Sequence, residues 1–176
     1  GDRLERGAFN ALPDTFAPDM WSHQYDQQAN QVLCTVAKRN WTNNGDEANI
    51  FGLEPNFGCC TANMHQGWPK FVRGLWMATA AGGLAAVAYG PCQVTATVGR
   101  GQAVTVVEET DYPFGETVRF TVQTTTPVRF PLSLRAPSWC AEATVTLADG
   151  TVQTLTPGTF HTVERTWQPR ETLEIG

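Results

Sequence analysis

Two adjacent cysteines, Cys59 and Cys60, are the residues of this 176-residue sequence best suited to chemistry. Thiolates bind Zn²⁺ and attack carbon, and a position at the N-terminus of a helix favours the thiolate form. Residues 40–58 are rich in Asn and Gly, which predicts a loop before the pair. Thr61 or Asn63 can cap a helix that follows, so we expect the cysteines just before a helix N-terminus.

The cysteine pair by itself is a weak metal signal. Structural zinc sites usually separate their cysteines by two to four residues, so a vicinal pair needs ligands from elsewhere. Vicinal cysteines also rarely bond to each other, because the ring that would form strains the peptide. For Cys34, Cys92 and Cys140 we expect separate buried thiols, the usual fate of unmodified cysteine. A disulfide scaffold is therefore not predicted.

Helices are expected on both sides of the loop that precedes the cysteines. Residues 2–16 resemble a short amphipathic helix ended by Pro13. After Cys60, a helix with Pro69 in its first turn is predicted by apolar residues that recur every three or four positions: Met64, Trp68, Phe71, Val72, Leu75 and Trp76. Residues 21–36 mix aromatic and amide side chains, a composition that suits the lining of a polar cavity.

The second half of the chain changes to short runs with β character. Turn residues separate the runs, and apolar residues alternate with Thr, Arg and Gln within them, as in an antiparallel β-sandwich. The expected strands are 84–89, 93–98, 103–108, 117–124, 128–135, 143–147, 161–166 and 172–175. Gly82 and Gly83 mark the best boundary, so we expect domains at 1–82 and 83–176. The first of them is too poor in helices to close a core alone.

The composition limits the kinds of molecule that this chain is expected to bind. The formal net charge is -5 and no basic run is present, which excludes nucleic acid as an expected partner. No apolar stretch reaches the ~18 residues of a membrane span, so we expect no membrane segment. The N-terminus is charged and lacks the apolar core of a signal peptide, so we expect the chain to be part of a longer protein.

Three blocks of the sequence together resemble one enzyme family. They are Glu5-Arg6-Gly7-Ala8-Phe9-Asn10, Phe57-Gly58-Cys59-Cys60-Thr61-Ala62-Asn63 and Leu84-Ala85-Ala86-Val87-Ala88-Tyr89-Gly90-Pro91. The family is that of the β-L-arabinofuranosidases, glycoside hydrolase family 127 and its relatives. The resemblance implies an α+β chain: the C-terminal part of an (α/α)6 toroid, then an antiparallel β-sandwich. It also implies that the chain packs on a missing N-terminal portion of the toroid.

The resemblance also implies roles for individual residues. Cys59 resembles the family's nucleophile, a zinc-bound thiolate that gives net retention of configuration, and Cys60 resembles a second zinc ligand. Tyr25, and His23 beside it, are candidates for binding sugar, although the residues around Tyr25 depart from the family's aromatic-Tyr-x-Asn-Pro pattern. The substrate implied is a glycan that contains L-arabinose. The family's Glu-x-Cys zinc ligands and its catalytic acid lie upstream, so we expect this chain alone to be inactive.

Plainer interpretations stand beside these. His65 is more often a surface or core histidine than a ligand, whereas for His23 the structural and sugar-lining interpretations are evenly weighted. His161, in an expected strand, is interpreted as structural, and Glu54 as a solvated loop carboxylate. For the whole chain, the alternatives are a non-catalytic carbohydrate-binding or structural module and, less favoured, a zinc or redox module built on the cysteine pair.

Overall fold

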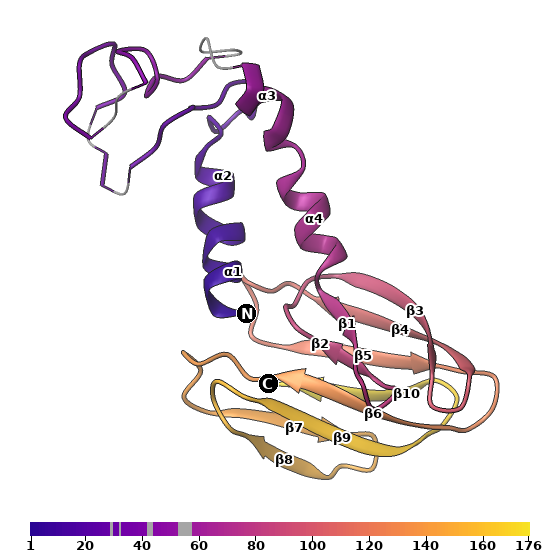
Figure 1. Ribbon diagram of the computed structural model, residues 1–176. Coiled ribbons are helices and arrows are strands. Elements are labelled where there is room, and N and C mark those ends of the chain that lie inside the picture. The colour runs from indigo at the N-terminus through magenta and orange to yellow at the C-terminus, as the bar shows by residue number, and fades with distance from the viewer. Residues whose placement is uncertain (29, 32, 42–43, 53–57) are drawn as a thin grey trace. The chain divides into compact units, whose positions relative to one another are not determined.

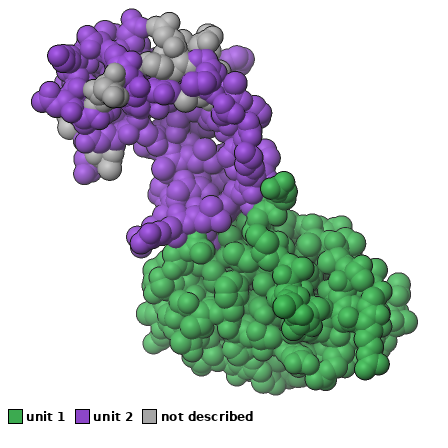
Figure 2. Space-filling model, in the orientation of Figure 1, with its two compact units in different colours: residues 1–2, 72–176 green, residues 3–71 purple. Residues whose placement is uncertain are grey.

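The structure is a computed structural model that describes residues 1–28, 30–31, 33–41, 44–52 and 58–176; for Cys60 and Thr61 it describes the backbone alone. The chain divides into two compact units (Figure 2). One unit comprises residues 3–71, and the other comprises residues 1–2 and 72–176. We call them the helical unit and the sandwich unit and describe each by itself.

The helical unit opens with the helix that the sequence predicts. Three consecutive segments form it: α1 (Asp2–Arg6), the π-helical η1 (Gly7–Ala11) and α2 (Leu12–Asp14). Pro13 lies inside this run, since Ala11 and Leu12 before it are already helical, so the prediction that Pro13 ends the helix is wrong by one residue. The helix ends at Asp14, within two residues of the predicted end.

The second predicted helix is wrong in its extent. The structure has two short helices, α3 (Gly58–Met64) and α4 (Gly67–Arg73), and Trp76 already belongs to a strand. Pro69 explains the break, because one continuous helix would require the N–H that proline lacks. A new helix that begins at Gly67 puts Pro69 in its first turn instead. The cysteine pair lies inside the first turn of α3, not before it.

The two helical segments pack as an antiparallel hairpin (Figure 1). The Phe9 ring lies 5.3 Å from that of Phe71 and 6.2 Å from that of Trp68, centroid to centroid. Gly67 faces Leu12 so closely that a Cβ there would lie 2.8 Å from its methyl groups. Phe9 and Phe71 are thus the apolar centre of the hairpin.

Between α2 and α3 the described backbone is held by a few hydrogen bonds and by isolated β-bridges. His23 bridges Phe16 on one side and Gly52 on the other. The Gln24 N–H donates to the Thr15 carbonyl at 2.9 Å, and the Asp26 N–H donates to the Ala48 carbonyl at 2.8 Å. These bonds fix the start and the end of the loop against each other.

The sandwich unit contains ten strands among the described residues. They are β1 (Trp76–Ala78), β2 (Leu84–Ala86), β3 (Cys92–Val98), β4 (Gln102–Thr110), β5 (Val118–Gln123), β6 (Val128–Arg135), β7 (Ala143–Leu147), β8 (Val152–Leu155), β9 (Phe160–Trp167) and β10 (Glu171–Ile175). All eight expected strands are present, β6 and β7 with the predicted bounds. β1 and β8 are additional: the first residue of β1, Trp76, is the last of the predicted helix, and β8 is a short edge strand.

Two sheets form the sandwich, in the orders β1-β2-β6-β9 and β3-β4-β5-β10-β7-β8. The prediction of a purely antiparallel fold is wrong at one place, since β2 pairs with β6 in parallel, Leu84 opposite Leu132. Side chains from both sheets fill the space between them. The Trp76 ring of β1 meets the Phe120 ring of β5 edge-on, 5.8 Å between centroids. Trp167, Phe120, Phe130 and Leu132 are fully buried there.

The β-sandwich part of the expected fold class is therefore present, whereas the toroid is not formed by this chain. In the described part of residues 1–75 the helices are short, none longer than seven residues. They make one hairpin, and a closed ring of helix pairs needs many more. The expected domain boundary between residues 82 and 83 stays a prediction.

Candidate active site

Cys59 lies on the surface of the helical unit. It is the second residue of α3, and its side chain is exposed. Asn63, expected as a helix cap, lies one turn further on, and its side-chain amide donates to the Cys59 carbonyl at 2.6 Å. Asn63 thus reinforces the turn that carries the thiol. Cys60 follows in the same turn, and its side chain lies outside the described residues.

A complete zinc site needs more ligands than the described part of the chain brings together. Tetrahedral zinc takes four ligands in a structural site, or three and a water in a catalytic one. Among the described residues, no three His, Cys, Asp or Glu side chains gather closely enough to hold a metal ion. The described residues alone therefore do not fit a zinc site.

The two predicted sugar-binding residues lie in the loop between α2 and α3. His23 is 7% exposed, and its Nδ1 lies 3.3 Å from the Gln24 carbonyl oxygen. The His23 N–H donates to Gly52 and its carbonyl accepts from the Gly52 N–H, at 3.0 and 3.1 Å. Tyr25 is half-buried. Both share the helical unit with Cys59, and their contact with sugar stays a prediction.

A hollow of about 720 Å³ opens in the same unit. Its lining combines amide and carboxylate groups with aromatic rings: Phe9, Asn10, Ala11, Pro13, Asp14, Phe16, Pro18, Gln27 and Gln28. Gln27 is fixed in place, since its Nε2 donates to the Ala11 carbonyl at 2.8 Å and its Oε1 lies 3.0 Å from the Thr15 hydroxyl. Planar polar groups beside aromatic faces are suited to a polyhydroxylated ligand.

The antiparallel hairpin relates this hollow to Cys59. Leu12, near the C-terminal end of α2, faces Gly67, at the start of α4. Because the two helical segments are antiparallel, α3 lies at the end of the hairpin where α2 stops. The segment from Pro13 to Pro18, which lines the hollow, leaves α2 at this end (Figure 1). The cysteine pair and the polar hollow are therefore at the same end of the helical hairpin. Asn10 and Asp14 line the hollow but were not predicted as site residues. Polar residues on a predicted helix are ordinary, and no sequence pattern set these two apart.

The remaining residues that the sequence brought into question lie as follows. His65 is exposed, and the Trp68 ring lies 6.2 Å from that of Phe9 and 6.0 Å from that of Phe71, in one cluster of three rings. His161 is structural as predicted: its Nε2 lies 2.7 Å from Gln153 Oε1 of the neighbouring hairpin. Glu54 lies outside the described residues.

The expectation of buried thiols is wrong for the three remaining cysteines. Cys34 is exposed, and Cys92 and Cys140 are half-buried. Cys34 lies in the loop between α2 and α3, where the described backbone has no regular strand or helix to cover it. None of these three cysteines is in a disulfide bond.

A buried carboxyl group with a raised pKa lies inside the sandwich unit, beside Cys92. Glu108 of β4 is 2% exposed and accepts hydrogen bonds from Trp76 Nε1 and the Gly90 N–H, both at 2.9 Å, and from Cys92 Sγ at 3.5 Å. Burial raises the pKa of Glu108 to about 7 and, with the nearby Glu108 charge, the pKa of Cys92 to about 12. The Glu108 carboxyl joins β1, the 87–91 segment and β3 inside the core.

No helix in the described part of the chain has the length and apolar character needed to cross a membrane.

No curated protein matches the chain significantly. Several solved structures are similar to it, including the following three. A glycoside hydrolase matches over 99% of this chain with a TM-score of 0.78 and 20% identity. A GH127 β-L-arabinofuranosidase from Geobacillus stearothermophilus T6 matches over 68% with a TM-score of 0.60 and 25% identity.

The third similar structure, a GH127 β-arabinofuranosidase, matches over 99% of the chain with a TM-score of 0.67 and 15% identity. This chain spans 28%, 19% and 27% of the three proteins, so it corresponds to less than a third of each. Residues 83–176 match the family model described as the β-L-arabinofuranosidase GH127 middle domain. Since that match covers more than half of the sequence and coincides with the sandwich strands from β2 onward, the chain belongs to the GH127 β-L-arabinofuranosidase family.

Proposed function

We propose that this chain is part of a retaining glycoside hydrolase that acts on β-L-arabinofuranosides, with Cys59 as the nucleophile. Membership of the GH127 family is the observation that carries the proposal. Two features of the helical unit support it. The Cys59 side chain is exposed, as a nucleophile must be, and a polar hollow opens at the same end of the hairpin.

The proposed reaction has two displacements. The Cys59 thiolate attacks the anomeric carbon, the glycosidic C–O bond breaks, and an acid outside the described residues protonates the leaving oxygen. Water then attacks the same carbon and gives a proton to the deprotonated acid, the C–S bond breaks, and the thiolate leaves. Two inversions give net retention. Asn63 acts as a positioning residue, because it holds the turn on which Cys59 lies.

The zinc that the family resemblance implies is part of this proposal. Cys59 and Cys60 would be two of its ligands, and the others would come from residues outside the described part of the chain. Zinc bound there would keep the thiol deprotonated. In the same way, the helical hairpin would be one element of an (α/α)6 toroid that is completed by segments beyond this chain.

The test uses the full-length protein that contains this chain. Replacement Cys59→Ser is expected to abolish hydrolysis of an aryl β-L-arabinofuranoside, while Cys34→Ser, a second exposed cysteine in the same unit, retains it. Product analysis by ¹H NMR should show the β-anomer first. Most activity surviving in Cys59→Ser, or the α-anomer formed first, would contradict the proposal.

Zinc is tested by metal content. We expect about one zinc per full-length chain, and its loss in Cys60→Ser. Full zinc in that variant would remove Cys60 from the ligand set. Because the proposal places the acid outside this chain, we expect the 176-residue chain alone to show no turnover of the same substrate; measurable hydrolysis would show that the chain contains its own acid.

A further inference from the structure

One end of the sandwich contains a cavity of about 320 Å³ that no sequence pattern indicated. Its floor consists of residues at strand ends: Val118 begins β5, Arg135 ends β6, Ala143 begins β7, and Ile175 ends β10. These residues come from both sheets, so the cavity opens between the sheets. Two loops form its walls, residues 111–117 after β4 and residues 136–142 after β6.

Three aromatic rings line the cavity: Tyr89, Tyr112 and Trp139. Tyr89 and Tyr112 meet edge-on with centroids 5.9 Å apart, so they support each other's orientation. Trp139, on the opposite loop, lines the cavity and is nevertheless 56% exposed. Phe114, at the tip of the first loop, is 97% exposed. Two large exposed rings on the loops beside one cavity leave apolar surface available to a ligand.

The charged groups at the cavity favour a ligand rich in hydroxyl groups over an anion. Glu116 and Glu142 are exposed carboxylates, one on each loop, and both line the cavity. Arg135, its only cation, is buried and already engaged: it forms an ion pair with Asp2 at 2.6 Å and a hydrogen bond to the Val87 carbonyl. An anion would be repelled by the carboxylates of Glu116 and Glu142, and the Arg135 guanidinium already has partners. Sugar hydroxyls, in contrast, can donate hydrogen bonds to both carboxylates.

We infer that this end of the sandwich is a second carbohydrate-binding site, separate from Cys59, with Trp139 as the ring on which a sugar stacks. The volume is at the lower end for small-molecule sites and suits about one or two sugar residues. Sugars bind proteins through the apolar face of the ring, against an aromatic side chain, and through their hydroxyls. The choice of L-arabinose as the sugar rests on the proposed function. The existence of the site rests only on the residues that line the cavity.

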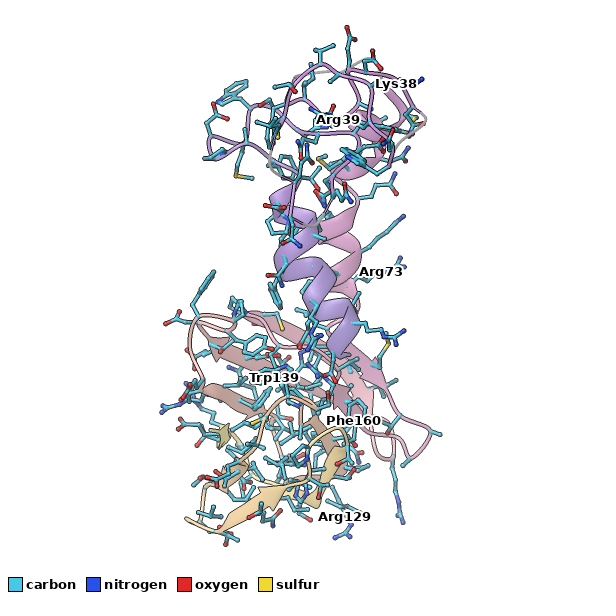
Figure 3. The ribbon with its side chains drawn as sticks, turned by 90° about the vertical axis from the view of Figure 1, so that its left-hand side faces the viewer. Lys38, Arg39, Arg73, Arg129, Trp139 and Phe160 are labelled. Atoms are coloured by element: carbon cyan, nitrogen blue, oxygen red, sulfur yellow. The ribbon has the colours of Figure 1, made fainter. Side chains whose placement is uncertain are left out.

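The test is affinity electrophoresis of the 176-residue chain in gels that contain soluble arabinan, a polymer of L-arabinose, with dextran as the control polymer. We expect arabinan to retard the chain and dextran to leave it unaffected. Trp139→Ala should weaken the retardation about tenfold or more, as expected for an aromatic anchor. Phe160→Ala is the matched control, because Phe160, labelled with Trp139 in Figure 3, is 50% exposed and does not line the cavity.

A second pair of variants separates the two sites. Cys59→Ser, and Gln28→Ala in the hollow, should leave the retardation unchanged if the sandwich binds arabinan. Retardation that is lost in Gln28→Ala but kept in Trp139→Ala would overturn the inference, as would no retardation of the original chain. Equal retardation by dextran would overturn the assignment to L-arabinose. Circular dichroism checks that each variant is folded, and Trp139→Phe should restore part of the binding.

Discussion

The two units differ in how well they enclose their own apolar residues. In the sandwich, large side chains such as Trp167, Phe120 and Leu132 are almost completely buried. In the described part of the helical unit, the buried apolar residues are Ala8, Ala48 and Phe71, while large ones are exposed: Leu4, Met20, Trp21, Leu33, Val36, Trp41 and Phe51. The sandwich holds itself together, whereas the residues proposed for chemistry lie on the unit with the smaller core.

This difference matches a common division of labour in proteins. Regions that bind ligands or move are drawn from the less stable parts of a structure, and a rigid element supports them. The same division should appear in the response to mutation. Changes inside the sandwich should unfold it, and changes of the same kind in the helical unit should have small effects on global stability.

The largest contrast is expected between two tryptophans. Trp167→Ala removes a fully buried ring and the hydrogen bond from its Nε1 to the Phe130 carbonyl, so the free energy of unfolding should fall by about 3–5 kcal/mol. Trp21→Ala, which truncates a ring that is 77% exposed, should change it by no more than about 0.5 kcal/mol. Urea unfolding followed by circular dichroism measures both. Equal changes in the free energy of unfolding for the two variants would contradict the proposed difference in core packing between the units.

The next contrast depends on pH. Because the pKa of Glu108 is raised from 4.5 to about 7, the folded state binds the proton more tightly than the unfolded state does. The resulting stabilisation is fully present below pH ~4.5 and is lost as the pH rises through ~7, by about 3 kcal/mol in total.

Glu108→Gln should flatten this part of the stability profile, measured by urea unfolding at a series of pH values. Glu109→Gln, at the exposed neighbouring position, is the matched control and should keep the slope. A profile of the Glu108 variant parallel to that of the original chain would show that another group titrates.

A glycine-to-alanine substitution in each unit compares how tightly the two units pack around their backbones. Gly83 lies against β6, and a Cβ there would be 2.0 Å from the Pro131 carbonyl oxygen, closer than any relaxed contact. Gly83→Ala should therefore destabilise the sandwich by about 1–3 kcal/mol in the same urea experiment.

Gly7→Ala should have the opposite sign and the smallest effect. Nothing lies within 4 Å of a Cβ at Gly7, which is in the helical run of the other unit. Alanine should favour that helix by about 0.5–1 kcal/mol, seen as slower amide hydrogen exchange in residues 3–14. Faster exchange would indicate that the π-helical segment requires glycine.

Sequence patterns predicted the sandwich well and the helical unit less well, for physical reasons. Alternation along β6 and β7 follows from one face being buried, and the structure has that face. The spacing of Trp68, Phe71 and Leu75 suggested one helix, but Leu75 lies after α4, and its carbonyl accepts from the Val87 N–H at 2.8 Å. Periodicity could not reveal that partner, because it comes from a distant part of the chain.

The candidate sites show the same limit. The cysteine pair stood out because vicinal cysteines are unusual, and its position near a helix start was predicted to within a turn. The hollow and the sandwich cavity were not predicted, since each is formed where separate segments meet. No sequence pattern distinguished Trp139, which the structure places on a loop with its side chain exposed beside the cavity.

The parallel pairing of β2 with β6 has a consequence for the order in which the chain can assemble. The β1–β2 hairpin is complete by Ala86, yet its partner strand ends only at Arg135, and β9, on the far side of that partner, ends at Trp167. During synthesis the hairpin would therefore wait, with the Leu84 side chain exposed, until almost the whole sandwich has left the ribosome. Such distant pairing slows folding, and chaperone contact during that interval should concentrate on residues 76–86.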